Sequence, residues 1–294
     1  MSKMRFFALQ ELANRKPLEV TPPSGKLSDY YGSHVFDRKK MQEYLPKEAY
    51  KAVTDAIEKG TPINREMADL IANGMKSWTQ WPREYRKREP QALEAFKAEN
   101  EEEIGFWKFL QYEFSIQWKK LKAYANANNV QILGDIPIYV SADSVDAWVG
   151  GPLFELDADG GFARVAGCPP DYFSAEGQLW GNPLYNWPYH KQTGYAWWIQ
   201  RVRHALGIYD LLRIDHFRGF DTYWAIPADS TTAKTGKWET GPRMELFNAL
   251  EDALGKLPII AEDLGELFPS VRELLADSTF PGMKVLQFAF GGGD

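Results

Sequence analysis

Apolar positions in the first hundred residues recur at helical spacing. Between residues 64 and 75 one helical stripe is formed by Met67, Leu70, Ile71 and Met75. Pro82 and Pro90 each suit the first turn of a helix, where a missing N–H costs nothing. We therefore expect residues 1–100 to form an α-helical subdomain.

A longer helix is predicted to follow. The three glutamates at 101–103 place negative charge in its first turn, where it favours the helix dipole. The helix should end near Asn128, and its apolar stripe comprises Phe106, Leu110, Phe114, Leu121 and Ala125.

From Val130 onward the pattern changes to short apolar runs alternating with helices. The predicted strands cover residues 130–140 (with a break at Gly134), 209–214, 258–261 and 284–290. The predicted helices cover residues 194–206 (capped by Gly207), residues 243–254 (stopped by Gly255) and a segment beginning near Pro269. Residues 141–192 are expected to be a long irregular stretch, and Trp224 and Trp238 to lie in a loop.

This alternation predicts an α/β protein with a parallel sheet. Elements of this size fit a (β/α)8 TIM barrel, whose chemistry lies at the carboxyl ends of the strands. A doubly wound sheet is the alternative, but no Gly-rich phosphate fingerprint follows any strand. About four of eight strands are recognisable, so we expect residues 101–294 to be a partial barrel and the chain to be a piece of something larger.

Composition narrows the class of function. The 294 residues are 44% hydrophobic and 25% charged, as in ordinary globular proteins, and the net charge of −6 argues against nucleic-acid binding. Aromatic residues reach 14%, with eleven tryptophans, which favours flat platforms for sugar rings or bases. No signal peptide or membrane-spanning run is recognisable, so the predicted location is cytoplasmic, with no membrane or protein partner.

The candidate chemistry lies where two apolar strands end in acid. Asp215 and His216 follow the first strand, and Glu262 with Asp263 follows the next. Three interpretations compete. The acids could be paired structurally with arginines, they could hold Mg²⁺ (which the nearby arginines disfavour), or they could cleave a glycosidic bond.

The residues favour glycoside chemistry. Arg213 lies two residues before Asp215, so both side chains share one face of the strand, and the guanidinium would keep a nucleophilic carboxylate ionised. Glu262 follows apolar residues with no adjacent cation, and such a dry setting suits a general acid. The irregular stretch adds side chains that could bind a sugar polymer: Asp171, Tyr172, Phe173, Trp180, Asn182, Tyr185 and Trp187.

These residues resemble the amylomaltase, or 4-alpha-glucanotransferase, family of the alpha-amylase-type clan. The resemblance covers roughly residues 78–290. It rests on the blocks GDIPIYV at 134–140, PPDYFS at 169–174, QLWGNPLY at 178–185, RIDHFRG at 213–219, AEDLG at 261–265 and PGMKVLQF at 281–288, with WP at 81–82 and FLQYEF at 109–114 upstream.

The resemblance implies a retaining, double-displacement enzyme. It would move a segment of an α-1,4-glucan (a maltooligosaccharide or a starch- or glycogen-derived dextrin) to the 4-hydroxyl of another glucan or glucose, without metal or cofactor. Asp215 matches the family's nucleophile and Glu262 its general acid/base, while the loop of Tyr172 and Phe173 resembles the one on the acceptor side. The remaining substrate-binding or supporting residues would be Asp135, Trp180, Asn182, Arg213, His216 and Asp263.

Part of the family pattern has no counterpart in the chain. The family's two leading barrel strands, its active-site tyrosine and the third essential carboxylate, on the seventh strand, are not recognisable. We therefore expect the chain to be inactive alone. Two alternatives stay open, an alpha-amylase-type hydrolase, distinguished from a transferase by how well its loops exclude water, and a non-catalytic glucan-binding fragment.

Overall fold

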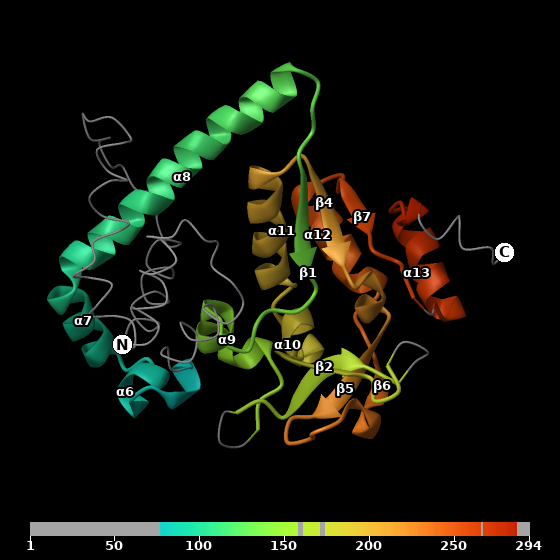
Figure 1. Cartoon of the computed structure of the whole chain (residues 1–294), viewed down its shortest axis with the longest axis horizontal. Helices are drawn as coiled ribbons and strands as arrows, with labels where there is room; N and C mark the ends of the chain where they lie inside the picture. Colours follow the sequence, from blue (N-terminus) through green and yellow to red (C-terminus); the bar gives the residue numbers. More distant parts are fainter. Residues whose placement is uncertain (1–76, 158–160, 171–173, 266, 287–294) are drawn as a thin grey trace, which may run out of the picture. The chain divides into compact units, whose positions relative to one another are not determined.

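We analysed a computed structural model of the chain, which describes residues 77–157, 161–170, 174–265 and 267–286 (Figure 1). The chain divides into two compact units, Met1–Phe114 and Ser115–Asp294. The stripe predicted between residues 64 and 75 lies outside the described residues. Within the described part of the chain, no helix is both long enough and apolar enough to cross a membrane.

The described part of the first unit consists of helices. Tyr85 and Phe96 pack edge to face with ring centroids 5.9 Å apart, and Trp78 and Trp81 are buried. Pro90 occupies the first turn of its helix, whereas Pro82 is the N-cap residue just before a helix. The elements are η1 (Trp78–Gln80), α6 (Arg83–Arg86), α7 (Pro90–Glu99) and the first half of α8 (Glu101–Ala127).

The second half of α8 belongs to the second unit, and it attaches through a different face from the one predicted. Leu121 is exposed. Trp118 and Lys122 instead donate hydrogen bonds, both of 2.8 Å, to the carbonyl oxygens of Ile208 and Tyr209. Those carbonyls lie at the end of helix α11 (Ala196–Ile208), where backbone acceptors have no partner within the helix. These hydrogen bonds, together with the edge-to-face packing of Trp118 against Tyr209, therefore set the contact face of α8.

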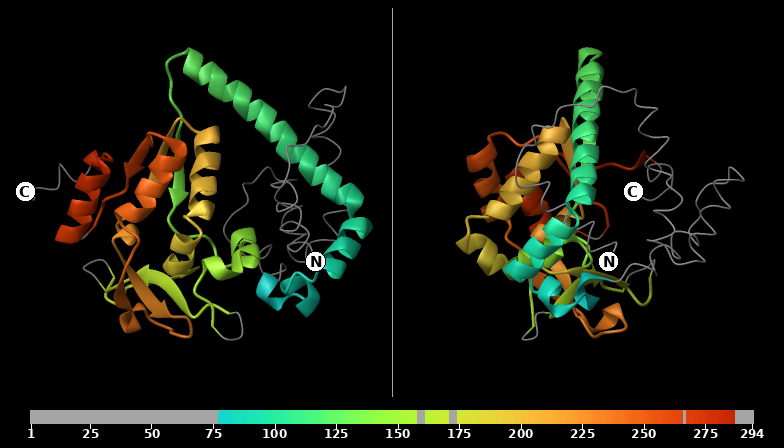
Figure 2. Two further views of the ribbon diagram at one scale, coloured as in Figure 1. Left: turned by 180° about the vertical axis from the view of Figure 1, so that it is seen from behind. Right: turned by 90° about the vertical axis from the view of Figure 1, so that its left-hand side faces the viewer.

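A parallel sheet forms the centre of the second unit, and it confirms the α/β class. Its strands are β1 (Leu133–Pro137), β4 (Leu211–Asp215) and β7 (Ile259–Ala261), in the order β1-β4-β7. Both pairs are parallel, so all three carboxyl ends lie at one edge (Figures 1 and 2). Besides α11, helices α12 (Met244–Leu254) and α13 (Pro269–Ser278) follow the strands, close to their predicted positions.

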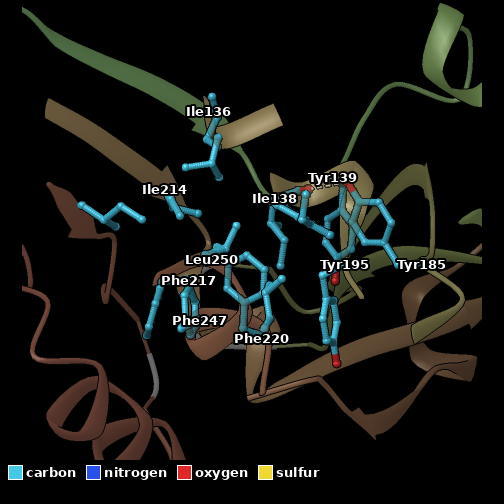
Figure 3. Packing of buried hydrophobic residues seen from close by; sticks show 14 of the residues in the cluster. Ile136, Ile138, Tyr139, Tyr185, Tyr195, Ile214, Phe217, Phe220, Phe247 and Leu250 are labelled. Atoms are coloured by element: carbon cyan, nitrogen blue, oxygen red, sulfur yellow. Dashed lines mark hydrogen bonds between the residues drawn. The ribbon is translucent and has the colours of Figure 1, made fainter. Parts of the chain in front are cut away.

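The two faces of this sheet differ in chemistry. Apolar side chains on one face, such as Leu212 and Ile214, are fully buried and join one core cluster with Phe217, Phe247 and Leu250 (Figure 3). Burying each such side chain contributes about 1.5–3 kcal/mol. The charged residues of the same strands alternate onto the opposite, half-exposed face. The helix-covered face therefore anchors the sheet and leaves the other face available for chemistry.

A second, antiparallel sheet was not predicted. Its strands are β2 (Arg164–Cys168), β3 (Gln178–Pro183), β5 (Thr222–Pro227) and β6 (Lys237–Thr240), in the order β3-β2-β5-β6. With helices α9 (Val145–Gly150) and α10 (Trp187–Gln192), they occupy part of the two segments expected to be irregular. The sheet lies beyond the carboxyl ends of the parallel strands (Figure 1). These strands escaped prediction because β2 pairs with β5 across a long sequence separation that no local window contains.

Three helix ends and one predicted strand can be compared with the local signals in the sequence. Gly255 caps α12 with a φ of 76°, as predicted, and Pro269 begins α13. Gly207 does not cap α11, which continues to Ile208. The strand predicted at 284–290 is also wrong where it is described, because residues 284–286 are not extended in a ladder and Gly282 instead bridges to Ala261. Residues 287–290 lie outside the described part.

Candidate active site

One guanidinium links two carboxylates on the open face of the parallel sheet. Register places Asp135 of β1 opposite Arg213 of β4. Nη1 of Arg213 donates to Oδ2 of Asp135 and Nη2 donates to Oδ1 of Asp215, both at 2.6 Å. The Arg213 side chain is 23% exposed, whereas those of Asp135 and Asp215 are 56% and 46% exposed. The predicted pairing of Arg213 with Asp215 is therefore present, and both acids remain accessible.

Glu262 lies beside Asp215 because the backbone pairing of β4 and β7 continues past the ends of the strands. The Glu262 N–H donates to the Ile214 carbonyl at 3.0 Å, and the Phe217 N–H donates to the Glu262 carbonyl at 3.1 Å. Its carboxylate accepts the backbone N–H of His216 at 2.9 Å and that of Leu264 at 2.8 Å. This differs from the dry setting expected from the sequence, since two backbone donors hold the half-buried carboxylate in place.

His216 joins the two acids through its backbone conformation. Its φ of 58° is left-handed, a region in which histidine is enriched, and this directs its N–H to Glu262. Burial, reinforced by the positive charge of Arg218 and opposed by Asp215, lowers the pKa of the His216 imidazole to about 4. The ring is therefore neutral at pH 7, and it packs edge-on against Trp180 with centroids 4.9 Å apart.

The antiparallel sheet brings aromatic and amide side chains to this edge. Asn182 of β3 donates its Nδ2–H to the Val140 carbonyl at 2.7 Å, which ties β3 to the segment after β1. Trp180, also on β3, is 36% exposed and donates to Gln178. Asn182 is therefore engaged by the backbone, while Trp180 remains partly accessible. Tyr172 and Phe173 lie outside the described residues.

Asp263 holds the segment that follows α13. Its Oδ1 accepts the backbone N–H of Met283 at 2.7 Å. The sulfur of Met283 in turn accepts the Nε–H of Arg213 at 3.1 Å. Met283 and Leu264 therefore belong to the site although the sequence assigned them no role, because a backbone donor and a thioether leave no charge pattern to detect.

Arg218 lies in the short 3-10 turn Phe217–Phe220 that follows β4. It is buried, with its guanidinium 4.3 Å from the ring centre of Trp238 and 4.6 Å from that of Phe268. This stacking joins the turn after Asp215 to β6 and to the segment after Glu262. Within the described residues, no group of three or more His, Cys, Asp or Glu side chains is arranged to hold a metal ion.

Together these contacts place two carboxylates at the ends of adjacent parallel strands in different settings. Asp215 is held by a guanidinium and Glu262 by backbone N–H groups. Such a pair can supply a nucleophile and a proton donor at one bond.

Family models match the chain in two places. The model described as 4-alpha-glucanotransferase matches residues 67–294. A second model, described as glutamine synthetase type III N terminal, matches residues 27–82, of which the structure describes only 77–82.

Known proteins match over most of the chain. A 4-alpha-glucanotransferase of Clostridium butyricum is 49% identical over 74% of this chain and 45% of the relative. One of Streptococcus pneumoniae serotype 4 is 45% identical over 90% of this chain and 54% of the relative. The solved amylomaltase from Streptococcus agalactiae in complex with acarbose is 38% identical with a TM-score of 0.73, covering 97% of this chain and 60% of that one. The chain thus spans about half the length of the curated relatives it matches.

Proposed function

Because the chain belongs to the 4-alpha-glucanotransferase family, we propose that the complete gene product transfers a segment of an α-1,4-glucan to the 4-hydroxyl of an acceptor glucan or glucose. The observation that carries the proposal is the pairing of Arg213-bound Asp215 with Glu262 at adjacent strand ends. The acarbose bound by the Streptococcus agalactiae relative, a sugar-like ligand, supports α-glucans as the substrate class.

In the proposed mechanism Asp215 is the nucleophile. Its carboxylate attacks the anomeric carbon while Glu262 protonates the departing glycosidic oxygen, and a covalent glycosyl-enzyme forms. Glu262 then removes a proton from the acceptor's 4-hydroxyl, which attacks the anomeric carbon and releases Asp215. Arg213 orients the Asp215 carboxylate for attack and stabilises the negative charge that returns to it when the acceptor displaces the glycosyl group, because Nη2 donates to Oδ1 at 2.6 Å.

The other predicted residues receive supporting roles in this proposal. Trp180 and the neutral ring of His216 offer an aromatic surface for a sugar face, with Tyr172 and Phe173 on the acceptor side. Asn182 shapes the site through its bond to the backbone, and Asp135 completes the bridge to Arg213.

We further propose that the parallel strands are part of a (β/α)8 barrel. The support is their shared direction, the helices over one face and the acids at their carboxyl ends. In this proposal residues 101–294 carry the barrel segment and residues 1–100 form the preceding helical subdomain.

The test is disproportionation of maltotriose by the complete gene product. Transfer yields glucose together with longer maltooligosaccharides, whereas a hydrolase would only shorten the chains and raise the count of reducing ends. Asp215→Asn should reduce transfer by at least about 10³-fold while the folded state survives, because the variant lacks the nucleophile. Asp229→Asn, in the exposed turn after β5, is the matched control and should retain wild-type turnover.

Trapping the intermediate identifies the nucleophile directly. A mechanism-based fluoroglycoside should label Asp215, as read by peptide mass spectrometry. Labelling of any other residue, or near-wild-type transfer by Asp215→Asn, would remove Asp215 from the role. Glucan binding without any turnover would favour a non-catalytic protein.

A further inference from the structure

A methionine after β7 completes the set of contacts around Arg213. The guanidinium donates in three directions, from Nη1 to Asp135, from Nη2 to Asp215 and from Nε to the sulfur of Met283. We propose that Met283 is a positioning residue for the proposed transfer reaction, setting the orientation of Arg213 and through it that of Asp215. This inference rests on the proposed function.

Orientation matters here because the bridge to Asp215 uses one oxygen. Nη2 of Arg213 binds Oδ1, so the direction of the guanidinium determines how Oδ2 is presented to an anomeric carbon. The carboxylates at either end of the bridge are about half exposed, and exposed ion pairs hold side chains weakly. Met283 is half-buried, and its sulfur contacts the Nε side of the guanidinium, where it limits rotation about the two ion pairs.

Met283 is itself held to the strand that ends in Glu262. The Ala261 N–H donates to the Pro281 carbonyl at 2.9 Å, and Gly282 bridges to Ala261. Asp263 then accepts the Met283 N–H. A Cβ at Gly282 would meet the Asp263 carboxylate and displace it, so glycine at this position lets that carboxylate lie against the segment. The segment 281–283 therefore contacts both the end of β7 and the Arg213 guanidinium on β4.

The competing explanation is that Met283 only fills space, since a thioether is a weak acceptor and an adaptable apolar group. Two substitutions separate these explanations. Met283→Leu keeps the apolar volume and removes the acceptor. Met283→Gln has similar length and places an amide oxygen where it can accept the Nε–H bond.

In the complete gene product we expect kcat for maltotriose disproportionation to fall about tenfold in Met283→Leu, with KM within about twofold of wild type. Met283→Gln should retain at least about half of the wild-type kcat. Each rate is divided by the amount of protein that a mechanism-based fluoroglycoside can trap as glycosyl-enzyme, so unfolded protein does not affect the comparison. Any other order of the two variants, including equal rates, overturns the proposal.

The control is Met244, which packs against the main apolar core and begins α12. There packing should decide the outcome, so Met244→Leu should be better tolerated than Met244→Gln. Asp263→Ala should act on the same contact as Met283→Leu, so the double variant should lose little more kcat than either single one. Additive losses of kcat would contradict the view that Asp263 and Met283 act through one contact.

A second measurement does not depend on activity. In the 294-residue chain, the Arg213 Nε–H resonance, assigned by its loss in Arg213→Lys, should exchange with water at least about tenfold faster in Met283→Leu than in wild type or Met283→Gln. Equal exchange in all three overturns the contact. If exchange follows this order but the wild-type gene product lacks transferase activity, the proposed function fails while the contact stands.

Discussion

His190 should make the stability of the second unit fall steeply in mild acid. The side chain is 0% exposed within α10, and its Nε2 lies 3.1 Å from the Leu153 carbonyl oxygen, to which it donates. Its ring contacts those of Tyr185, Trp187 and Trp197. Burial lowers the pKa of this imidazole to about 4, although the bond to Leu153 opposes the shift.

The magnitude follows from linkage. Between the unfolded pKa of 6.5 and the folded pKa of about 4, the unfolded chain binds more protons than the folded one. The stability contributed by a neutral His190 is therefore present above pH 6.5 and is lost as the pH falls toward 4. Summing the two protonation equilibria gives a loss of about 2 kcal/mol between pH 7 and pH 5.

The assay is urea unfolding of the 294-residue chain at both pH values, followed by tryptophan fluorescence, which reports on the rings around His190. His190→Gln keeps a donor near Leu153 and cannot titrate. Its baseline stability at pH 7 can differ from wild type, so only the change with pH is compared. Wild type should lose about 2 kcal/mol more than the variant between pH 7 and pH 5. His216 titrates in both proteins and cancels, and equal pH dependence would refute the reasoning.

Two further predictions concern stability of the same chain. Asp221 is fully buried and accepts hydrogen bonds from Arg243 and Ser270, so Asp221→Ala should cost about 3 kcal/mol in urea unfolding and Ser270→Ala only about 1 kcal/mol; equal costs would contradict the importance of the buried ion pair. A Cβ at Gly167 would collide with the backbone of β3, so Gly167→Ala should cost about 2 kcal/mol. Gly207, with open space around it in α11, is its control, and Gly207→Ala should stabilise the chain by about 1 kcal/mol.

Where local chemistry determines an element, the sequence was sufficient to predict it. The acidic first turn of α8, the glycine after α12 and the proline opening α13 each act within one helical turn, and the corresponding helices form close to their predicted positions. β4 and β7 were recognisable because buried parallel strands are short apolar runs. The two-residue spacing of Arg213 and Asp215 likewise predicted a contact on one face, and that contact is present.

Where an element's contact partner is distant in the chain, the sequence was insufficient to predict the contact. The antiparallel sheet was missed because β2 is stabilised by β5. The exposed face of α8 was misjudged because hydrogen bonds and ring packing at the distant end of α11 decide how it docks. The setting of Glu262 was also different, since its two donors are backbone N–H groups that every residue type provides.

The amino-acid sequence by itself thus determined the α/β class, the parallel strands and the two acids, Asp215 and Glu262. These depend on periodicity and spacing within a few residues of one another. Only the tertiary structure decided how those acids are held, because a guanidinium shared with Asp135, a backbone donor from His216 and the sulfur of Met283 come together through the register of neighbouring strands. Register depends on packing between distant segments, which no local pattern encodes.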